Sequence, residues 1–158
     1  MTHHSNAEAR LGELGITLPA SAGGSKTRVP AVRTGNLVFL SGHGPAAGPD
    51  GTVAAGKCGR EYTQEQGYDQ ARLTGLNLLR SLRDEVGSLD NVVRIVKVLG
   101  MVNCAPGFNK TSAVVDGASD LFVEVFGPEI GRHARSAVGM AELPLDFPVE
   151  IELVAEVE

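Results

Sequence analysis

The chain has 158 residues, a length typical of one domain, and 42% of them are hydrophobic, which is enough for a substantial core. Asp and Glu outnumber Lys and Arg by 19 to 14, so the formal net charge is −5. Because the basic residues are scattered and form no patch of the kind that displaces phosphate counterions, we expect no nucleic-acid partner.

The amino terminus and the cysteines carry two further expectations. Residues 1–10 are polar and lack the apolar region of a secretory signal, and no apolar run is long enough to cross a bilayer. We therefore expect a cytoplasmic protein without a membrane partner. Cys58 and Cys104 stand in no CxxC pattern and have no His at ligand spacing, so they predict free thiols and no metal site.

The first elements of the chain are a short helix and a hairpin. Apolar residues at helical spacing place the helix at Asn6–Leu14, where Gly15 would end it, and a Gly-rich loop follows at 19–25. Two runs of β-forming residues, Val29–Val32 and Leu37–Leu40, flank a Gly-Asn turn and predict a hairpin.

A long helix is the clearest element of the sequence. Thr63 and Gln66 form a capping-box pattern, and apolar residues then recur at helical spacing until Gly87. The polar side of this helix, which includes Arg80, is expected to face water. Before the helix, Thr52–Ala54 is a candidate for a further short strand.

The rest of the chain predicts a strand, a helix and two strands. In chain order they are Val92–Val102, Ser112–Phe126, Ala134–Ala141 and Val149–Val157. A loop at 103–110 precedes the helix, and Gly127-Pro128 would end it. Since apolar residues and glutamates alternate along the last strand, one of its faces should meet a core and the other water or a neighbouring subunit.

This order of elements favours a two-layer α+β fold. Two main helices with this many strands are expected to pack on one face of a mixed sheet. The opposite face would be bare in a monomer, which makes it a candidate for subunit packing.

Sequence motifs of the common enzyme classes are missing, so the candidates are single residues. Arg135 begins a strand of small and apolar residues. It either forms a surface or intersubunit ion pair, or binds a carboxylate with its planar guanidinium through two parallel hydrogen bonds. Glu150 begins the last strand. It is either a solvated edge glutamate or, if it faces a cleft beside Arg135, a group that orients or activates water.

Two histidines are weaker candidates. His43 follows a strand and the Ser41-Gly42 turn, a common place for a ligand contact, although simple exposure to solvent is the alternative. His133 precedes Arg135 by two residues, a spacing that puts both on one face if the strand extends that far.

Three segments of the sequence together resemble a known family. Arg135–Pro144 and Val149–Ala155 combine an arginine, a Leu-Pro pair and a Glu-Ile-Glu run, and Gly35–Gly42 is a strand that ends in Ser-Gly. These segments resemble the RidA/YjgF family, whose members are also described as endoribonuclease L-PSP-like proteins or translation inhibitors. The order of elements agrees with the family over 29–157.

This resemblance implies a chorismate-mutase-like fold assembled as a homotrimer, with a small carboxylate metabolite bound between subunits. Family members hydrolyse 2-imino or 2-aminoacrylate acids, such as 2-iminobutanoate and 2-iminopropanoate, to keto acids and ammonia. Arg135 would hold the substrate carboxylate and Glu150 would position the attacking water. The Ser41-Gly42 turn would line the same cleft, and no metal or organic cofactor is implied.

The sequence also departs from the family pattern. Arg28, His43, Asp116 and Ala137 stand where deaminating members carry tyrosine, glutamine, asparagine and cysteine. Residues 1–26 form an amino-terminal extension of the single domain, and 103–112 is lengthened. These departures indicate a divergent, longer branch. Asp116 would disfavour an anionic substrate unless Arg28 offsets its charge, so we include Arg28, Asp116 and His133 among the candidate substrate-binding residues.

Three functions follow, in order of preference. The first is an enamine/imine deaminase or related hydrolase. The second is a non-catalytic trimer that captures a small carboxylate as sensor or scavenger, which the loss of the Tyr and Asn counterparts favours. The third, ribonuclease or translation inhibitor, is disfavoured by the acidic balance and by the lack of a basic or aromatic platform.

Overall fold

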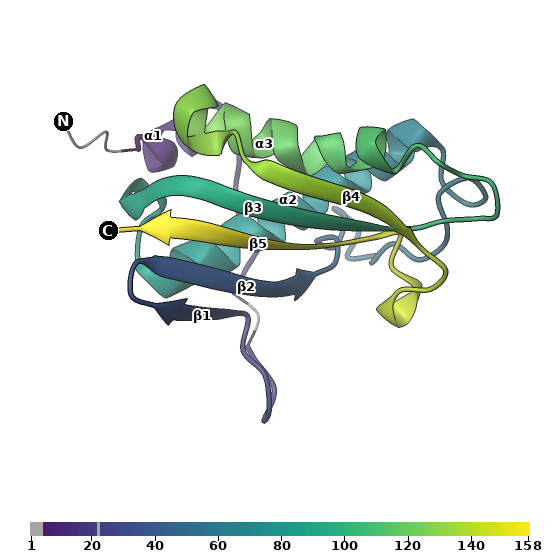
Figure 1. Cartoon of the computed structure of the whole chain (residues 1–158), viewed down its shortest axis with the longest axis horizontal. Helices are drawn as coiled ribbons and strands as arrows, with labels where there is room; N and C mark the ends of the chain where they lie inside the picture. Colours follow the sequence, from purple (N-terminus) through teal and green to yellow (C-terminus); the bar gives the residue numbers. More distant parts are fainter. Residues whose placement is uncertain (1–4, 22) are drawn as a thin grey trace.

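The computed structural model describes residues 5–21 and 23–158, and a five-stranded mixed sheet organises them (Figure 1). The strand order is β1-β2-β5-β3-β4, in which β3 and β4 run parallel and all other neighbours antiparallel. The strands are β1 (Ala31–Thr34), β2 (Leu37–His43), β3 (Val92–Asn103), β4 (Ala134–Met140) and β5 (Val149–Val157). The helices are α1 (Ala7–Glu13), α2 (Gln64–Val86) and α3 (Thr111–Gly131), with short 3-10 turns at Leu89–Asn91 and Pro144–Asp146.

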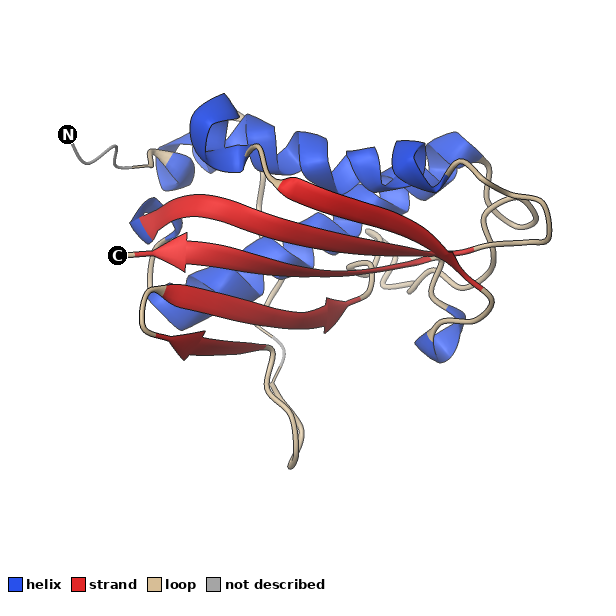
Figure 2. Cartoon of the chain, viewed as in Figure 1, coloured by secondary structure: helices blue, strands red, loops and turns tan. Residues whose placement is uncertain are grey.

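Both long helices cover the same face of the sheet, and the other face is open toward the viewer in Figure 2. The predicted two-layer α+β arrangement is therefore confirmed. The alternation of β5 is also confirmed, because its odd-numbered residues from Val149 to Val157 are buried beneath the helices. On the open face, large apolar side chains remain exposed, including Val32 at 54% and Phe39 at 45%.

A glycine sets how closely the two long helices approach. A Cβ atom on Gly117 of α3 would overlap the backbone carbonyl oxygen of Tyr68 on α2. The capping box at the start of α2 is formed as predicted, with Thr63 Oγ1 accepting from the Gln66 amide and Gln66 Oε1 accepting from the Thr63 amide. Since α2 and α3 share a core with β3 and β5, their spacing determines how the whole helical layer sits on the sheet.

The amino-terminal extension packs along the helical layer. Ala7 and Leu11 of α1 are buried, and α1 contacts α3. The chain then passes α2, where Arg80 donates a hydrogen bond to the Ala20 carbonyl and Ser21 Oγ donates to Asp84 Oδ2 at 2.6 Å. Beyond this point it reaches β1, so the extension runs from the helices to the edge of the sheet.

One predicted strand is wrong, and several predicted boundaries differ from the structure. The hairpin strands are Ala31–Thr34 and Leu37–His43 instead of Val29–Val32 and Leu37–Leu40, because the pairing of β2 with β5 continues past Leu40 to His43. Thr52–Ala54 is a loop, because its backbone is used in a local turn in which Gly48 donates to the Thr52 carbonyl. α3 continues to Gly131, since the break at Gly127 (φ 78°, ψ 167°) lets Pro128 begin a new helical turn, where a missing N–H costs little. β3 includes Asn103, which is fully buried and is bonded to Lys57 Nζ.

The expected exposure of Arg80 is also wrong, because this residue is only 4% exposed. Helical periodicity placed it on the polar side of α2, but the extension covers that side. Among the described residues, no helix is both long and apolar enough to span a membrane.

Candidate functional site

The Ser41-Gly42 turn lies at an irregularity of the sheet. Between Leu40 and His43 the pairing with β5 moves from Leu153 to Ile151, so β2 advances three residues while β5 advances two. The extra residue is a β-bulge, a feature that redirects side chains at the ends of strands. The bulge places Ser41 and Gly42 beside the segment that leads into β1.

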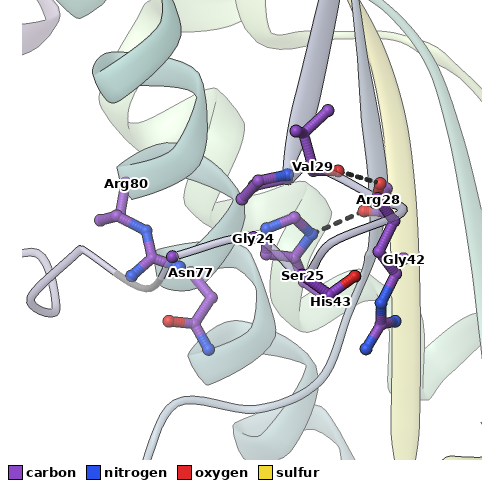
Figure 3. A pocket seen from close by; sticks show the side chains of 11 residues that line it. Gly24, Ser25, Arg28, Val29, Gly42, His43, Asn77 and Arg80 are labelled. Atoms are coloured by element: carbon purple, nitrogen blue, oxygen red, sulfur yellow. Dashed lines mark hydrogen bonds between the residues drawn. The ribbon is translucent and has the colours of Figure 1, made fainter.

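Hydrogen bonds hold this turn from two sides. Ser41 Oγ donates to the Val29 carbonyl at 2.7 Å, and the Ser41 amide donates to the Pro30 carbonyl at 2.9 Å. His43 Nδ1 lies 2.6 Å from the Ser41 carbonyl oxygen, as Figure 3 shows. The segment that leads into β1 and the His43 ring thus fix the Ser41 peptide together.

The position of His43 is set in turn by α2. Its Nε2 lies 2.7 Å from Ser81 Oγ, and Ser81 Oγ accepts a hydrogen bond from Arg80 Nε at 3.3 Å. Burial, with a smaller contribution from the charge of Arg80, lowers the pKa of His43 below its ordinary value. The ring is therefore neutral near pH 7, with its proton on Nδ1, because a carbonyl can only accept. His43 is a positioning residue for the turn rather than a proton donor to a ligand.

Glu150 lies against Gly42. A Cβ atom on Gly42 would overlap Oε1 of Glu150, so the carboxylate can occupy this place only because residue 42 is glycine. Among the described residues, the Glu150 carboxylate forms no hydrogen bond. Burial and the nearby charge of Glu152 raise the pKa of Glu150, and the positive charge of Arg28 lowers it in part. An unpartnered carboxylate with a raised pKa is suited to accept a proton from water.

Arg135 belongs to a separate cluster on α3. The β3–β4 register pairs it with the buried Val98, so its side chain faces the helices. Its Nη1 donates to Asp116 Oδ1 at 2.7 Å and to Ser119 Oγ at 3.0 Å, and its Nη2 donates to Ser112 Oγ at 2.7 Å. The guanidinium is thus paired with an anion, and the Arg135 side chain is 19% exposed.

His133 joins this cluster through Ser119. Its Nε2 lies 3.0 Å from Ser119 Oγ, and its Nδ1 lies 2.7 Å from the Gly131 carbonyl oxygen. Burial lowers the pKa of His133, with a smaller contribution from Arg135. His133 lies just before β4 and contacts the same serine as Arg135, so the two side chains do lie close together.

One chain does not bring Arg135 and Glu150 together. β3 separates β4 from β5 in the sheet, and Glu150 alternates with the buried residues of β5, whereas Arg135 faces α3. The candidate residues form two groups. Arg28, Ser41, Gly42, His43 and Glu150 make up the turn group, and Asp116, His133 and Arg135 make up the helix group. Any site that uses both groups needs residues from a second copy.

Comparison with known proteins gives the family. The family described as "YjgF/chorismate mutase-like, putative endoribonuclease" matches residues 8–157. The chain belongs to this YjgF family. The protein TCP17 of Trypanosoma cruzi is 40% identical over 148 residues, which are 94% of this chain and 92% of TCP17.

Solved structures agree with the YjgF fold. Atu1372 of Agrobacterium tumefaciens, a protein of unknown function, superposes with a TM-score of 0.84 at 37% identity, over 96% of this chain and 91% of its own. A Shewanella oneidensis MR-1 protein, whose description names an endoribonuclease, superposes with a TM-score of 0.88 at 32% identity, over 96% and 99%. Such coverage means that most of segment 1–26 has a counterpart in both relatives.

Several residues that lie beside the turn group were not predicted from the sequence. Arg80, Ser81 and Asn77 come from α2, and their approach depends on how α2 crosses behind β2. The same holds for Ser112 and Ser119 around Arg135. Serines on a helix carry no signal of such a role, because spacing within the helix does not show which strand lies beside it.

The cysteines and possible metal ligands take no part in either group. Burial raises the pKa of Cys58 to about 11, and Cys104 is also a free thiol with a raised pKa. Neither thiol is therefore an activated nucleophile near neutral pH. Within 5–21 and 23–158, no three His, Cys, Asp or Glu side chains are arranged to hold a metal ion.

Proposed function

We propose that this YjgF-family chain is a hydrolase of 2-imino acids, acting in a cleft between the subunits of a homotrimer. The observation that carries the proposal is the unpartnered Glu150 carboxylate held against Gly42, beside Arg28, on the open side of the sheet. Arg135 of one subunit would hold the substrate carboxylate, and Glu150 of the next would activate water.

The proposed reaction needs few catalytic groups. Water adds across the C=N bond of an imine that is already electrophilic, while Glu150 accepts a proton from the water. That proton passes to the imine nitrogen, which gives a carbinolamine. The C–N bond of the carbinolamine then breaks as its oxygen forms the C=O bond, and Glu150 transfers the hydroxyl proton to the departing nitrogen. The products are a 2-keto acid and ammonia, and no electrons are transferred. Correct positioning of one water and one carboxylate supplies most of the required acceleration.

The geometry of one chain supports a site that is shared with a second copy. Arg135 and Glu150 lie on different sides of the sheet, and the open face exposes Val32, Phe39 and Val138. Exposed apolar side chains on a continuous sheet face are typical of subunit contacts. A trimer that buries this face would bring the edge strand β4 of one subunit toward the turn group of another.

The test is hydrolysis of 2-iminopropanoate, generated in situ by oxidising alanine with an amino-acid oxidase. We expect the protein to accelerate keto acid formation over buffer, and Arg135→Ala to lower that acceleration by about tenfold or more, because a charge-assisted bidentate contact is lost. Arg94→Ala, which removes an exposed arginine from β3, is the matched control and should behave like the unmodified protein. Equal rates for the protein, for Arg135→Ala and for buffer would contradict the proposal.

A second candidate function is capture of a small carboxylate without turnover. The position of Asp116 favours it, because Asp116 stands where deaminating members carry asparagine and is paired with Arg135, so the residue set of those members is not kept. Binding of pyruvate that depends on Arg135, together with no hydrolysis of the imine, would select this function over the first.

The Asp116 carboxylate gives a direct prediction for either function. Asp116→Asn should tighten pyruvate binding by about tenfold, because the amide keeps the space but no longer neutralises Arg135. Titration calorimetry measures the dissociation constant. Asp120→Asn removes a carboxylate one turn along α3 that accepts from the Tyr68 hydroxyl, and it should leave affinity unchanged. Unchanged or weaker binding by Asp116→Asn would show that Arg135 does not receive the ligand.

Ribonuclease activity is less well supported. The net charge is −5, and the turn group contains a carboxylate but no aromatic side chain on which a base could stack.

A further inference from the structure

One pocket, which the turn group lines in part, is not used in the proposed activation of water. It has a volume of about 310 Å³ and lies between the extension, the end of β2 and α2 (Figure 3). Its walls are Gly23–Ser25, Arg28–Pro30, Ser41–His43, Asn77 and Arg80. Gly42, which contacts Glu150, belongs to the wall, so the pocket adjoins the carboxylate that would activate water.

We propose that this pocket receives a second anionic group of the substrate, so that the preferred substrates are 2-imino dicarboxylates rather than monocarboxylates. The turnover part of this inference rests on the proposed hydrolase function. The binding part does not, because a keto dicarboxylate should occupy the same place.

The charge of the pocket wall supports an anion. Its lining residues include two arginines, Arg28 and Arg80, and no aspartate or glutamate. His43 adds no charge near pH 7, since burial lowers its pKa. A wall with positive charge, hydroxyl groups and backbone amides is suited to a carboxylate group.

Arg80 is a buried cation that is only loosely paired. It is 4% exposed, and its hydrogen bonds go to neutral acceptors, Ser81 Oγ and the Ala20 carbonyl. Its Nε lies 3.8 Å from Asp84 Oδ2, an ion-pair distance too long for a hydrogen bond. Because an incompletely paired buried charge is costly, an anion in the pocket would improve the environment of this guanidinium.

Arg28 is the more accessible of the two cations. It is exposed, and its guanidinium lies alongside β5 in Figure 3. Its charge acts on Glu150 without a hydrogen bond between them. Arg28 therefore both lines the pocket and acts on Glu150, so its planar guanidinium could bind a carboxylate group at the far end of a substrate.

The extension gives the pocket its shape. The Ser25 amide donates to the Arg28 carbonyl at 2.9 Å, which closes a tight loop, and a Cβ atom on Gly24 would lie 2.7 Å from that carbonyl oxygen. This loop presents Arg28 at the pocket wall. Arg135 does not serve the same group, because in the proposed function it holds the carboxylate beside the imine.

The experiment compares two ligands that differ only at the far end. Titration calorimetry measures the affinities for 2-oxoglutarate and for 2-oxoglutaramate, in which an amide replaces the distal carboxylate. We expect 2-oxoglutarate to bind about tenfold or more tightly, and Arg28→Gln to bring the ratio of affinities close to one. Arg28→Lys, which keeps the charge and loses the fork, should give an intermediate ratio. Lys26→Gln removes a nearby exposed charge outside the pocket and should leave the ratio unchanged.

Each outcome decides the inference. Equal affinities for the two ligands, no binding of either, or a ratio that Arg28→Gln leaves intact would overturn it. If 2-iminopropanoate is hydrolysed but 2-oxoglutarate binds no more tightly than 2-oxoglutaramate, the hydrolase proposal is retained and the distal anion site is rejected. If the ratio depends on Arg28 but no imine is hydrolysed, the anion site stands and the hydrolase proposal falls.

Discussion

Glu150→Gln is expected to lower kcat for imine hydrolysis by about a hundredfold or more, the usual contribution of a general base. The amide keeps the shape of the side chain against Gly42 but cannot accept a proton from water. Substrate affinity should change much less, because in the proposed mechanism Arg135 holds the carboxylate. Steady-state kinetics with imine generated in situ separates kcat from KM, and an unchanged kcat would remove Glu150 from the mechanism.

The pH profile gives an independent check of the same residue. Glu150 must be ionised to act as a base, and burial and Glu152 raise its pKa. kcat/KM should therefore fall toward acid with an apparent pKa above the ordinary glutamate value of 4.5. Glu152→Gln removes one cause of the raised pKa of Glu150, so the acidic limb of the kcat/KM profile should move to lower pH.

The stability of Glu150→Gln shows whether a loss of activity comes from lost catalysis or from unfolding. A raised pKa means that the folded state holds the Glu150 proton more tightly than the unfolded chain does. This group therefore lowers stability as the pH rises from the unfolded value through the folded one. At neutral pH, Glu150→Gln should unfold at the same Tm as the unmodified protein or higher, so a loss of activity cannot be assigned to unfolding.

Gly117→Ala is the second change with a large expected effect. The added methyl would overlap the Tyr68 carbonyl oxygen on α2, and backbone cannot move aside as a flexible side chain can. Forcing α2 and α3 apart should cost about 3 kcal/mol, more than the gain of about 1 kcal/mol from replacing glycine inside a helix. Urea unfolding at one fixed protein concentration measures the difference.

Gly12→Ala is the matched control for this prediction. Gly12 lies in α1, is exposed, and has open space where its Cβ atom would be. The same chemical change should there leave the free energy of unfolding unchanged or raise it by up to about 1 kcal/mol. Equal stability of both variants would mean that the helix layer can shift freely on the sheet.

Much of the fold could be predicted because its signals are local. The capping box at Thr63, the alternation along Val149–Val157 and the β-branched run of β3 each specify an element from neighbouring residues alone. The break at Gly127 was located correctly, but whether a helix resumes after a proline depends on what packs against the next turn.

The arrangement of the site could not be predicted in the same way. The family resemblance predicts that Arg135 and Asp116 lie near one cleft, but it does not predict their 2.7 Å contact, which depends on how α3 lies over β4. The helical pattern predicts that Arg80 is exposed to solvent. It cannot show that residues some sixty positions earlier in the chain cover this side chain. Contacts between distant segments decide both cases.

The bulge between Leu40 and His43 makes the turn group sensitive to the length of β2. Side chains of a strand alternate between faces, so deleting one residue there would restore a regular ladder with β5. His43 would still pair with Ile151 and would keep its face and its contact with Ser81. Only one residue would then separate Leu40 from His43, where Ser41 and Gly42 now both stand. The Ser41-Gly42 turn against which Glu150 lies therefore exists only because β2 is one residue longer here than the stretch of β5 that it pairs with.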